Sequence, residues 1–209
     1  MKDDGYPSDV AFTPSVKAVQ TRKGSRDRYL RMEQNGSWAT RITPDLRSFI
    51  EAQTSVFLAT ANPTGQPYVQ HRGGPPGFLR VIDDITLGFV DYAGNRQYVT
   101  LGNLADNANA FLFLIDYAHR QRVKIWGTAR VVEGAADLTA ELMPEGYRAR
   151  AEQVILFTIS AWNANCAQHI PQRFEAADVA AALAQRDERI AALEAEVKGL
   201  RGELETARS

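Results

Sequence analysis

Apolar and polar residues alternate through much of the middle of the chain, with the two-residue period of a strand that has one buried face. The alternation is clearest at 122–133, where Val123, Ile125, Ala129 and Val131 share one face. Other apolar runs predict strands at 55–61, 67–72, 78–82, 85–91, 109–117 and 153–162. About seven short strands with few long helices between them favour a closed antiparallel barrel.

Peripheral helices are expected around this barrel. At Thr43 a capping hydroxyl precedes Pro44, which suits a first helical turn, so a helix is predicted to begin there. Residues 95–107 also favour a helix, and 135–150 favour a helix or irregular chain. Residues 1–42 are polar and are predicted to be irregular. This N-terminal arm is expected to pack on the body or on a partner subunit, or alternatively to bind an anion through its basic residues.

The composition changes at Glu175, after which Ala, Glu, Arg and Leu dominate. From Val179 to Leu204, apolar residues recur at spacings of three and four, and Arg186 is the one polar member of the series. This heptad pattern predicts a helix that runs about 39 Å between these residues. We expect it to pair with the same helix of a second subunit. The alternatives are a helix that folds back onto the barrel and a solvated helix whose heptads occur by chance. The expected parts are an N-terminal arm, a barrel domain and a C-terminal helix, at 1–42, 43–174 and 175–209.

Charge and cysteine content exclude several classes of function. The formal net charge is −1, which attracts neither nucleic acid nor an anionic membrane surface. The chain has no apolar run of membrane-spanning length, and its first residues lack the apolar segment of a secretory signal. Cys166 is the only cysteine, and the histidines are three and scattered. We therefore expect a cytoplasmic protein with no metal, no membrane partner and no nucleic-acid partner.

Residues suited to an anionic ligand gather at two strand ends. His71-Arg72-Gly73 ends one strand with a guanidinium that can hold a phosphate and a glycine that lets a flat ligand approach. Asn95-Arg96-Gln97 precedes an expected helix, whose free N–H groups would act together with Arg96. The alternative is a plain strand-to-loop turn for the first segment and an ordinary polar helix start for the second.

Two further segments carry polar groups. Arg122 and Lys124 share one strand face, which could meet a phosphate or the electron-rich edge of a flavin, or could simply be solvated. The loop after the last strand holds Trp162, His169 and Arg173, a density unusual for a mere connection.

These segments are QHRGGPPGFLRVID, GNRQYVTLGNLADN, RVKIWGTARVVE and AWNANCAQHIPQRF. In this order they resemble the pyridoxamine 5′-phosphate oxidase-like family, and most closely its shorter related flavoproteins. The resemblance covers roughly 43–174. It implies a mainly β fold, an antiparallel FMN-binding split β-barrel with peripheral helices, here followed by the long C-terminal helix. It also implies a homodimer with FMN at the subunit interface and flavin contacts from both chains.

The resemblance implies a set of cofactor-binding residues, namely Arg72, Gly73, Arg80, Asn95, Arg96, Gln97, Arg122, Trp162 and Arg173. Arg72 and Arg80 match the family's phosphate-binding Arg and Lys, with a Gly-Gly-Pro-Pro insert between them. Arg96 matches a family Lys. Arg122 replaces a family Gln and could stabilise negative charge on the reduced flavin ring.

His169 and His71 are the candidates to face the substrate, and no residue is assigned to catalysis itself. Relative to the family, His169 and Arg173 lie one residue further from Trp162, and an Asp between them is missing. Pyridoxamine phosphate is therefore not the expected substrate. We expect an FMN-dependent oxidoreductase that acts on an unknown small molecule. The alternative is a non-catalytic flavin, haem or deazaflavin binding module, a carrier or sensor.

Overall fold

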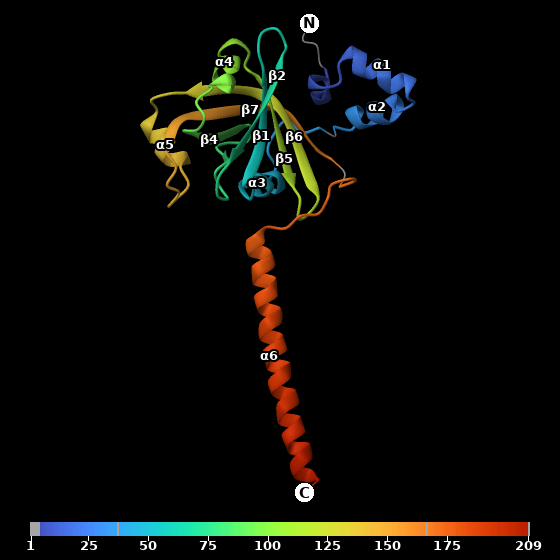
Figure 1. The fold of residues 1–209 in the computed structure, drawn as a ribbon. Helices are drawn as coiled ribbons and strands as arrows, with labels where there is room; N and C mark the ends of the chain where they lie inside the picture. The colour runs from blue at the N-terminus through green and yellow to red at the C-terminus, as the bar shows by residue number, and fades with distance from the viewer. Residues whose placement is uncertain (1–4, 37, 166, 209) are drawn as a thin grey trace. The chain divides into compact units, whose positions relative to one another are not determined.

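A computed structural model describes residues 5–36, 38–165 and 167–208. The chain divides into two compact units, one of Met1–Asp116 with Gln121–Gln168 and the other of Tyr117–Arg120 with His169–Ser209. The first unit contains all the strands (Figure 1), which are β1 (Ser55–Ala61), β2 (Pro67–Gly73), β3 (Arg80–Val81), β4 (Thr86–Tyr92), β5 (Asn109–Asp116), β6 (Gln121–Val132) and β7 (Ala151–Asn165).

The strands form one seven-stranded sheet in the order β2-β1-β5-β6-β7-β4-β3, and every neighbouring pair is antiparallel. This confirms the mainly β, antiparallel split-barrel prediction. The sheet is not closed, because no pairing joins β2 to β3 within the described ranges. The expectation of full closure is therefore wrong. The run Gly74-Pro75-Pro76-Gly77 follows β2, and proline has no N–H to donate to a strand ladder.

The core lies inside the curved sheet and follows the two-residue period of the strands. On β1, Val56 and Leu58 are fully buried, and on β6 the buried positions include Val123 and Ile125. The β6–β7 register shifts between Trp126 and Gly127. A Cβ at Gly127 would lie 2.0 Å from the carbonyl oxygen of Thr158, so only glycine fits this bulge.

Three helices cover the sheet, α3 (Pro44–Glu51), α4 (Val99–Asp106) and α5 (Ala136–Leu142). Thr43 caps α3 as predicted, because its hydroxyl accepts a hydrogen bond from the Leu46 N–H at 3.2 Å. Leu46 and Ile50 enter the main core from this helix. The α4 helix packs on β1, β2 and β6, and α5 packs on β4 and β7.

The N-terminal arm is largely helical, so the prediction of irregular chain is wrong. Its elements are η1 (Pro7–Val10), α1 (Pro14–Arg22) and α2 (Arg26–Gln34). Polar contacts join them, since Arg26 donates to Gln20 at 2.8 Å and forms an ion pair with the buried Glu33. The arm also packs on the body of its own chain, where Trp38 stacks on Trp126 with ring centroids 4.8 Å apart. Apolar residues at helical spacing do not mark these helices, because polar contacts rather than an apolar face hold them together.

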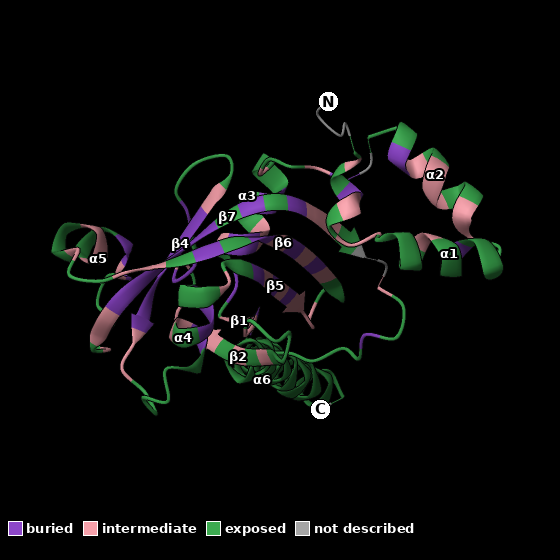
Figure 2. Ribbon diagram, turned by 90° about the horizontal axis from the view of Figure 1, so that it is seen from above, coloured by how far each residue is buried: buried purple, intermediate pink, exposed green. Residues whose placement is uncertain are grey.

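The second unit contains the long helix α6 (Ala176–Ala207), which confirms the predicted C-terminal helix. None of its described residues is buried, and Figure 2 colours it as exposed along its length. Of the helices that the structure describes, none has the length and apolar content that crossing a membrane requires.

Candidate functional site

A buried ion pair joins the ends of two strands on the first unit. Arg72 lies near the end of β2 and pairs with Asp91 of β4, and their side chains are only 12% and 5% exposed. The second carboxylate oxygen of Asp91 accepts a hydrogen bond from Gln153 Nε2 of β7 at 2.6 Å. Three strands far apart in the sequence thus contribute to one polar cluster.

Burial dominates the electrostatics of this cluster. It raises the pKa of Asp91, and the charge of Arg72 offsets only part of that rise. Burial also lowers the pKa of Arg72, again against the opposing effect of the paired carboxylate. The Nε of Arg72 and the hydroxyl of Tyr92 are buried and have no hydrogen-bond partner among the described residues. The cluster therefore holds donor groups that a ligand could use.

A loop with unusual backbone geometry lies next to this cluster. Arg96 and Tyr98 both adopt left-handed conformations, with φ of 58° and 53°. The Arg96 Nε donates to the Tyr98 hydroxyl at 2.9 Å, and that hydroxyl donates to Glu152 at 3.1 Å. Asn95 Oδ1 accepts from the N–H of Gln97 at 3.2 Å. Strained backbone of this kind occurs often at binding sites, and here it places Arg96 with its side chain 62% exposed.

Two adjoining hollows share Gln70, Arg72, Asp91, Tyr92 and Gly94 in their linings. The larger, of about 200 Å³, is also lined by residues that include His71, Gly73 and Phe78. The smaller is lined in addition by Asn95, Arg96 and Glu152, among others. Four of the predicted cofactor-binding residues and one of the two substrate-facing candidates therefore meet here. We call this pair of hollows the Arg72 pocket.

Other predicted residues lie elsewhere on the first unit. Arg80 is exposed on β3 opposite Gly88, and the exposed Gln97 is not part of either lining. Trp162 packs against the core, and its indole N–H donates to the Arg41 carbonyl oxygen at 2.8 Å. These placements leave the predicted ligand contacts of the three residues untested.

Arg122 lies on the outer face of the sheet. Its Nε is buried without a partner in the described part of the chain. Burial, together with the charge of Arg122, lowers the pKa of Lys124. On the strand beside them, Phe113 lies opposite Lys124 and is half-buried. The two cations share one face of the sheet, as the alternation predicted, and Phe113 lies beside them on that face.

His169 and Arg173 belong to the second unit, and their predicted roles as ligand contacts stay predictions. The guanidinium of Arg173 lies over the ring of Tyr117, with its central carbon 4.7 Å from the ring centroid. His169 is exposed and has a left-handed φ of 65°. Cys166, the only cysteine of the sequence, lies outside the described residues.

Sequence reasoning missed the carboxylate partners of the arginines, Asp91 and Glu152, and also Gln153, whose amide donates to Asp91. The signal at Asp91 was a carboxylate that interrupts the apolar run Phe89-Val90 near a strand end. No local pattern pairs it with Arg72, because that contact depends on the sheet topology. No cluster of three or more metal-ligating side chains occurs in the described ranges.

A protein-family model described as pyridoxamine 5′-phosphate oxidase matches residues 42–166, more than half of the chain. The chain belongs to the pyridoxamine 5′-phosphate oxidase family. The match begins one residue before Thr43 and covers every strand of the sheet. A search of curated proteins finds no matching sequence.

This chain also aligns with solved structures at low sequence identity. HupZ of Group A Streptococcus is 21% identical, with a TM-score of 0.49, over 64% of this chain and 99% of that one. An FMN-binding protein of Syntrophomonas wolfei is 9% identical, with a TM-score of 0.46, over 70% and 97%. HutZ, the haem storage protein of Vibrio cholerae, is 16% identical, with a TM-score of 0.42, over 57% and 90%. Resemblance at this level does not identify a ligand for this chain.

Proposed function

We propose that the chain binds FMN and acts as an FMN-dependent oxidoreductase on a small molecule, as a homodimer with FMN at the subunit interface. The observation that carries this proposal is the Arg72 pocket in a member of this family. There a buried arginine keeps an unused Nε–H beside the unpaired hydroxyl of Tyr92. Such fixed, partly desolvated donors suit a phosphate group.

Two guanidinium groups at the pocket, each with a carboxylate partner, could also contact an anion. Arg72 is held by Asp91, and Arg96 lies 3.5 Å from Glu152. A phosphate carries more charge than either carboxylate, so it can share these guanidinium groups with them. Arg72, Gly73, Asn95 and Arg96 are the residues that would hold it. FMN supplies the redox chemistry when it is bound, and the chain supplies its position and electrostatic surroundings.

The outer face of the sheet supports the proposed homodimer. Phe57 and Phe113 lie opposite each other on β1 and β5, and both are only half-buried. Arg122 on the next strand carries a buried Nε without a partner in the described part of the chain. A second subunit on this face would cover the aromatic rings, and a flavin there could accept the Nε–H of Arg122 at its anionic edge.

The first test is the identity of the small molecule that copurifies with the protein. We expect flavin absorbance and release of FMN rather than FAD. A colourless protein that takes up no added FMN would refute the proposal, and uptake of haem or a deazaflavin instead would replace the cofactor. Reduction by NAD(P)H and turnover with an acceptor would support an enzyme. A tightly bound flavin inert to reductants would indicate a carrier or sensor. The cytoplasmic location also stays a prediction.

A further inference from the structure

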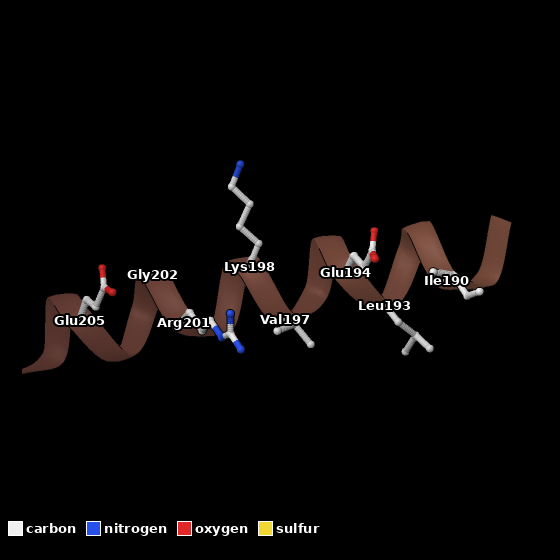
Figure 3. A pocket seen from close by; sticks show the side chains of 8 residues that line it. All are labelled: Ile190, Leu193, Glu194, Val197, Lys198, Arg201, Gly202 and Glu205. Carbon is white, nitrogen blue, oxygen red and sulfur yellow. The ribbon is translucent and has the colours of Figure 1, made fainter. Parts of the chain in front are cut away.

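The α6 helix presents an apolar stripe of exposed side chains. Apart from Arg186, the stripe is apolar, and its exposed fractions run from 40% at Leu193 to 56% at Leu204. Figure 3 shows Leu193 and Val197 on one side of the helix and Lys198 on the other. Exposed apolar stripes of this length are stabilised by a partner surface.

The stripe divides into the two core positions of a heptad. Position a holds Leu183, Ile190, Val197 and Leu204, and position d holds Val179, Arg186, Leu193 and Leu200. In the central heptads, β-branched residues occupy a and leucines occupy d. This combination favours two parallel strands over three or four. Gly199 and Gly202 fall at the outer positions c and f, so neither interrupts the seam.

The flanking charges match a parallel pair in the same register. In that arrangement each g residue faces the e residue five positions later on the other helix. The facing pairs are Arg189 with the partner subunit's Glu194, Glu196 with the partner subunit's Arg201, and Glu203 with the partner subunit's Arg208. All three pairs are of opposite charge. An antiparallel pair centred at residue 195 would also bring Arg189 and Glu203 together, but it would place two copies of Glu194 beside each other, and two copies of Glu196.

We propose that α6 forms a parallel, in-register, two-stranded coiled coil with α6 of a second copy of this chain. The partner that packs on the stripe is thus an identical helix. The residues at positions a and d and the complementary flanking charges both favour it. Arg186 occupies one d position. A polar residue there is compatible with this register but lowers the stability of the coiled coil. The inference does not depend on FMN and fails or holds separately from the proposed cofactor.

Charge reversal in the full-length chain tests the facing pairs. Glu196→Arg places like charges together at two symmetry-related sites, and adding Arg201→Glu restores attraction. Glu188→Arg is the matched control. It makes the same charge change at the outer position f, and neither glutamate has a charged neighbour three or four residues away on its own helix. The helical thermal midpoint should fall for Glu196→Arg, recover in the double variant and stay unchanged in the control.

Disulfide formation tests the orientation. Leu200→Cys is made in a Cys166→Ser background, so that the new thiol is the only one. Parallel in-register helices bring the two introduced thiols together, and oxidation should link two chains. Glu196→Arg should slow this linkage by about tenfold, as expected from reversing two exposed ion pairs, and added salt should shrink the difference. No linkage, or equal effects of Glu196→Arg and Glu188→Arg, would overturn the proposal.

Discussion

Arg72→Gln separates the structural role of the buried ion pair from its role toward a ligand. The substitution leaves Asp91 only 5% exposed and without its cation. Breaking a buried pair in this way destabilises a protein by about 3–5 kcal/mol. Because Gln153 still donates to Asp91 at 2.6 Å, we expect the lower end, about 3 kcal/mol, or a Tm lower by about 6–12 °C.

The loss of stability in Arg72→Gln should depend on pH. The direction of the pKa shift of Asp91 determines the direction of that dependence. Burial already raises the pKa of Asp91 above its unfolded value, and removing Arg72 raises it further. The folded variant then binds a proton more readily than the unfolded chain. The contribution of Asp91 to the stability of the variant is therefore greatest at low pH and is lost as the pH rises through the raised pKa of Asp91. Urea unfolding without flavin at pH 5 and pH 8 should show the larger deficit at pH 8.

A double variant completes the assay. Arg72→Gln with Asp91→Asn removes the unpaired charge and should recover most of the stability. It should not recover the FMN affinity, which we expect to fall by about tenfold to a hundredfold in both variants. The control Arg41→Gln breaks the exposed pair with Asp84 and should cost less than about 1 kcal/mol. Wild-type FMN affinity in the double variant, or a single-variant loss no larger than the control's, would refute this reasoning.

Three further predictions test other parts of the molecule. Arg96→Ala should lower FMN affinity by about tenfold to a hundredfold in a fluorescence titration, with an unchanged circular dichroism spectrum; an unchanged affinity would argue against Arg96 as a phosphate contact. Gly127→Ala should destabilise the fold by about 3 kcal/mol in urea unfolding, because the added Cβ meets the Thr158 carbonyl; a neutral result would mean that the bulge relaxes. Pyridoxamine 5′-phosphate should give little or no hydrogen peroxide and pyridoxal phosphate, since the spacing around His169 and Arg173 departs from the family; brisk production of both would contradict this.

Much of the sheet was predictable because burial on one face imposes a two-residue period. The bounds predicted for β1 match the structure, and β5 and β6 differ by at most one residue at each end. The Thr43 cap and the C-terminal helix also followed from local rules of sequence. The N-terminal helices did not, because Arg26, Gln20 and Glu33 join them through polar contacts that leave little apolar period. Closure of the barrel would require β2 to pair with β3, the strands at the two ends of the sheet order. No local pattern in the sequence shows whether these two strands pair.

The partners of the pocket arginines were beyond sequence reasoning for a related reason. Asp91 is 19 residues from Arg72 along the chain and 62 from Gln153, and only the strand order brings the three together. From the sequence alone, Arg72 and Arg96 are two positive charges with no identified carboxylate partner. In the fold each has a carboxylate partner, so the Arg72 pocket is close to neutral rather than strongly positive.

That neutrality limits which ligands the Arg72 pocket can favour. A ligand with a single diffuse charge gains little by displacing Asp91, whose contact with Arg72 is buried and already formed. A phosphate can instead use the donors that the carboxylates leave unused, the Nε–H of Arg72 and the hydroxyl of Tyr92. Recognition would then rest on directed hydrogen bonds more than on net charge. FMN binding should therefore weaken less with added salt than binding to two unpaired arginines would, because the paired charges already screen one another.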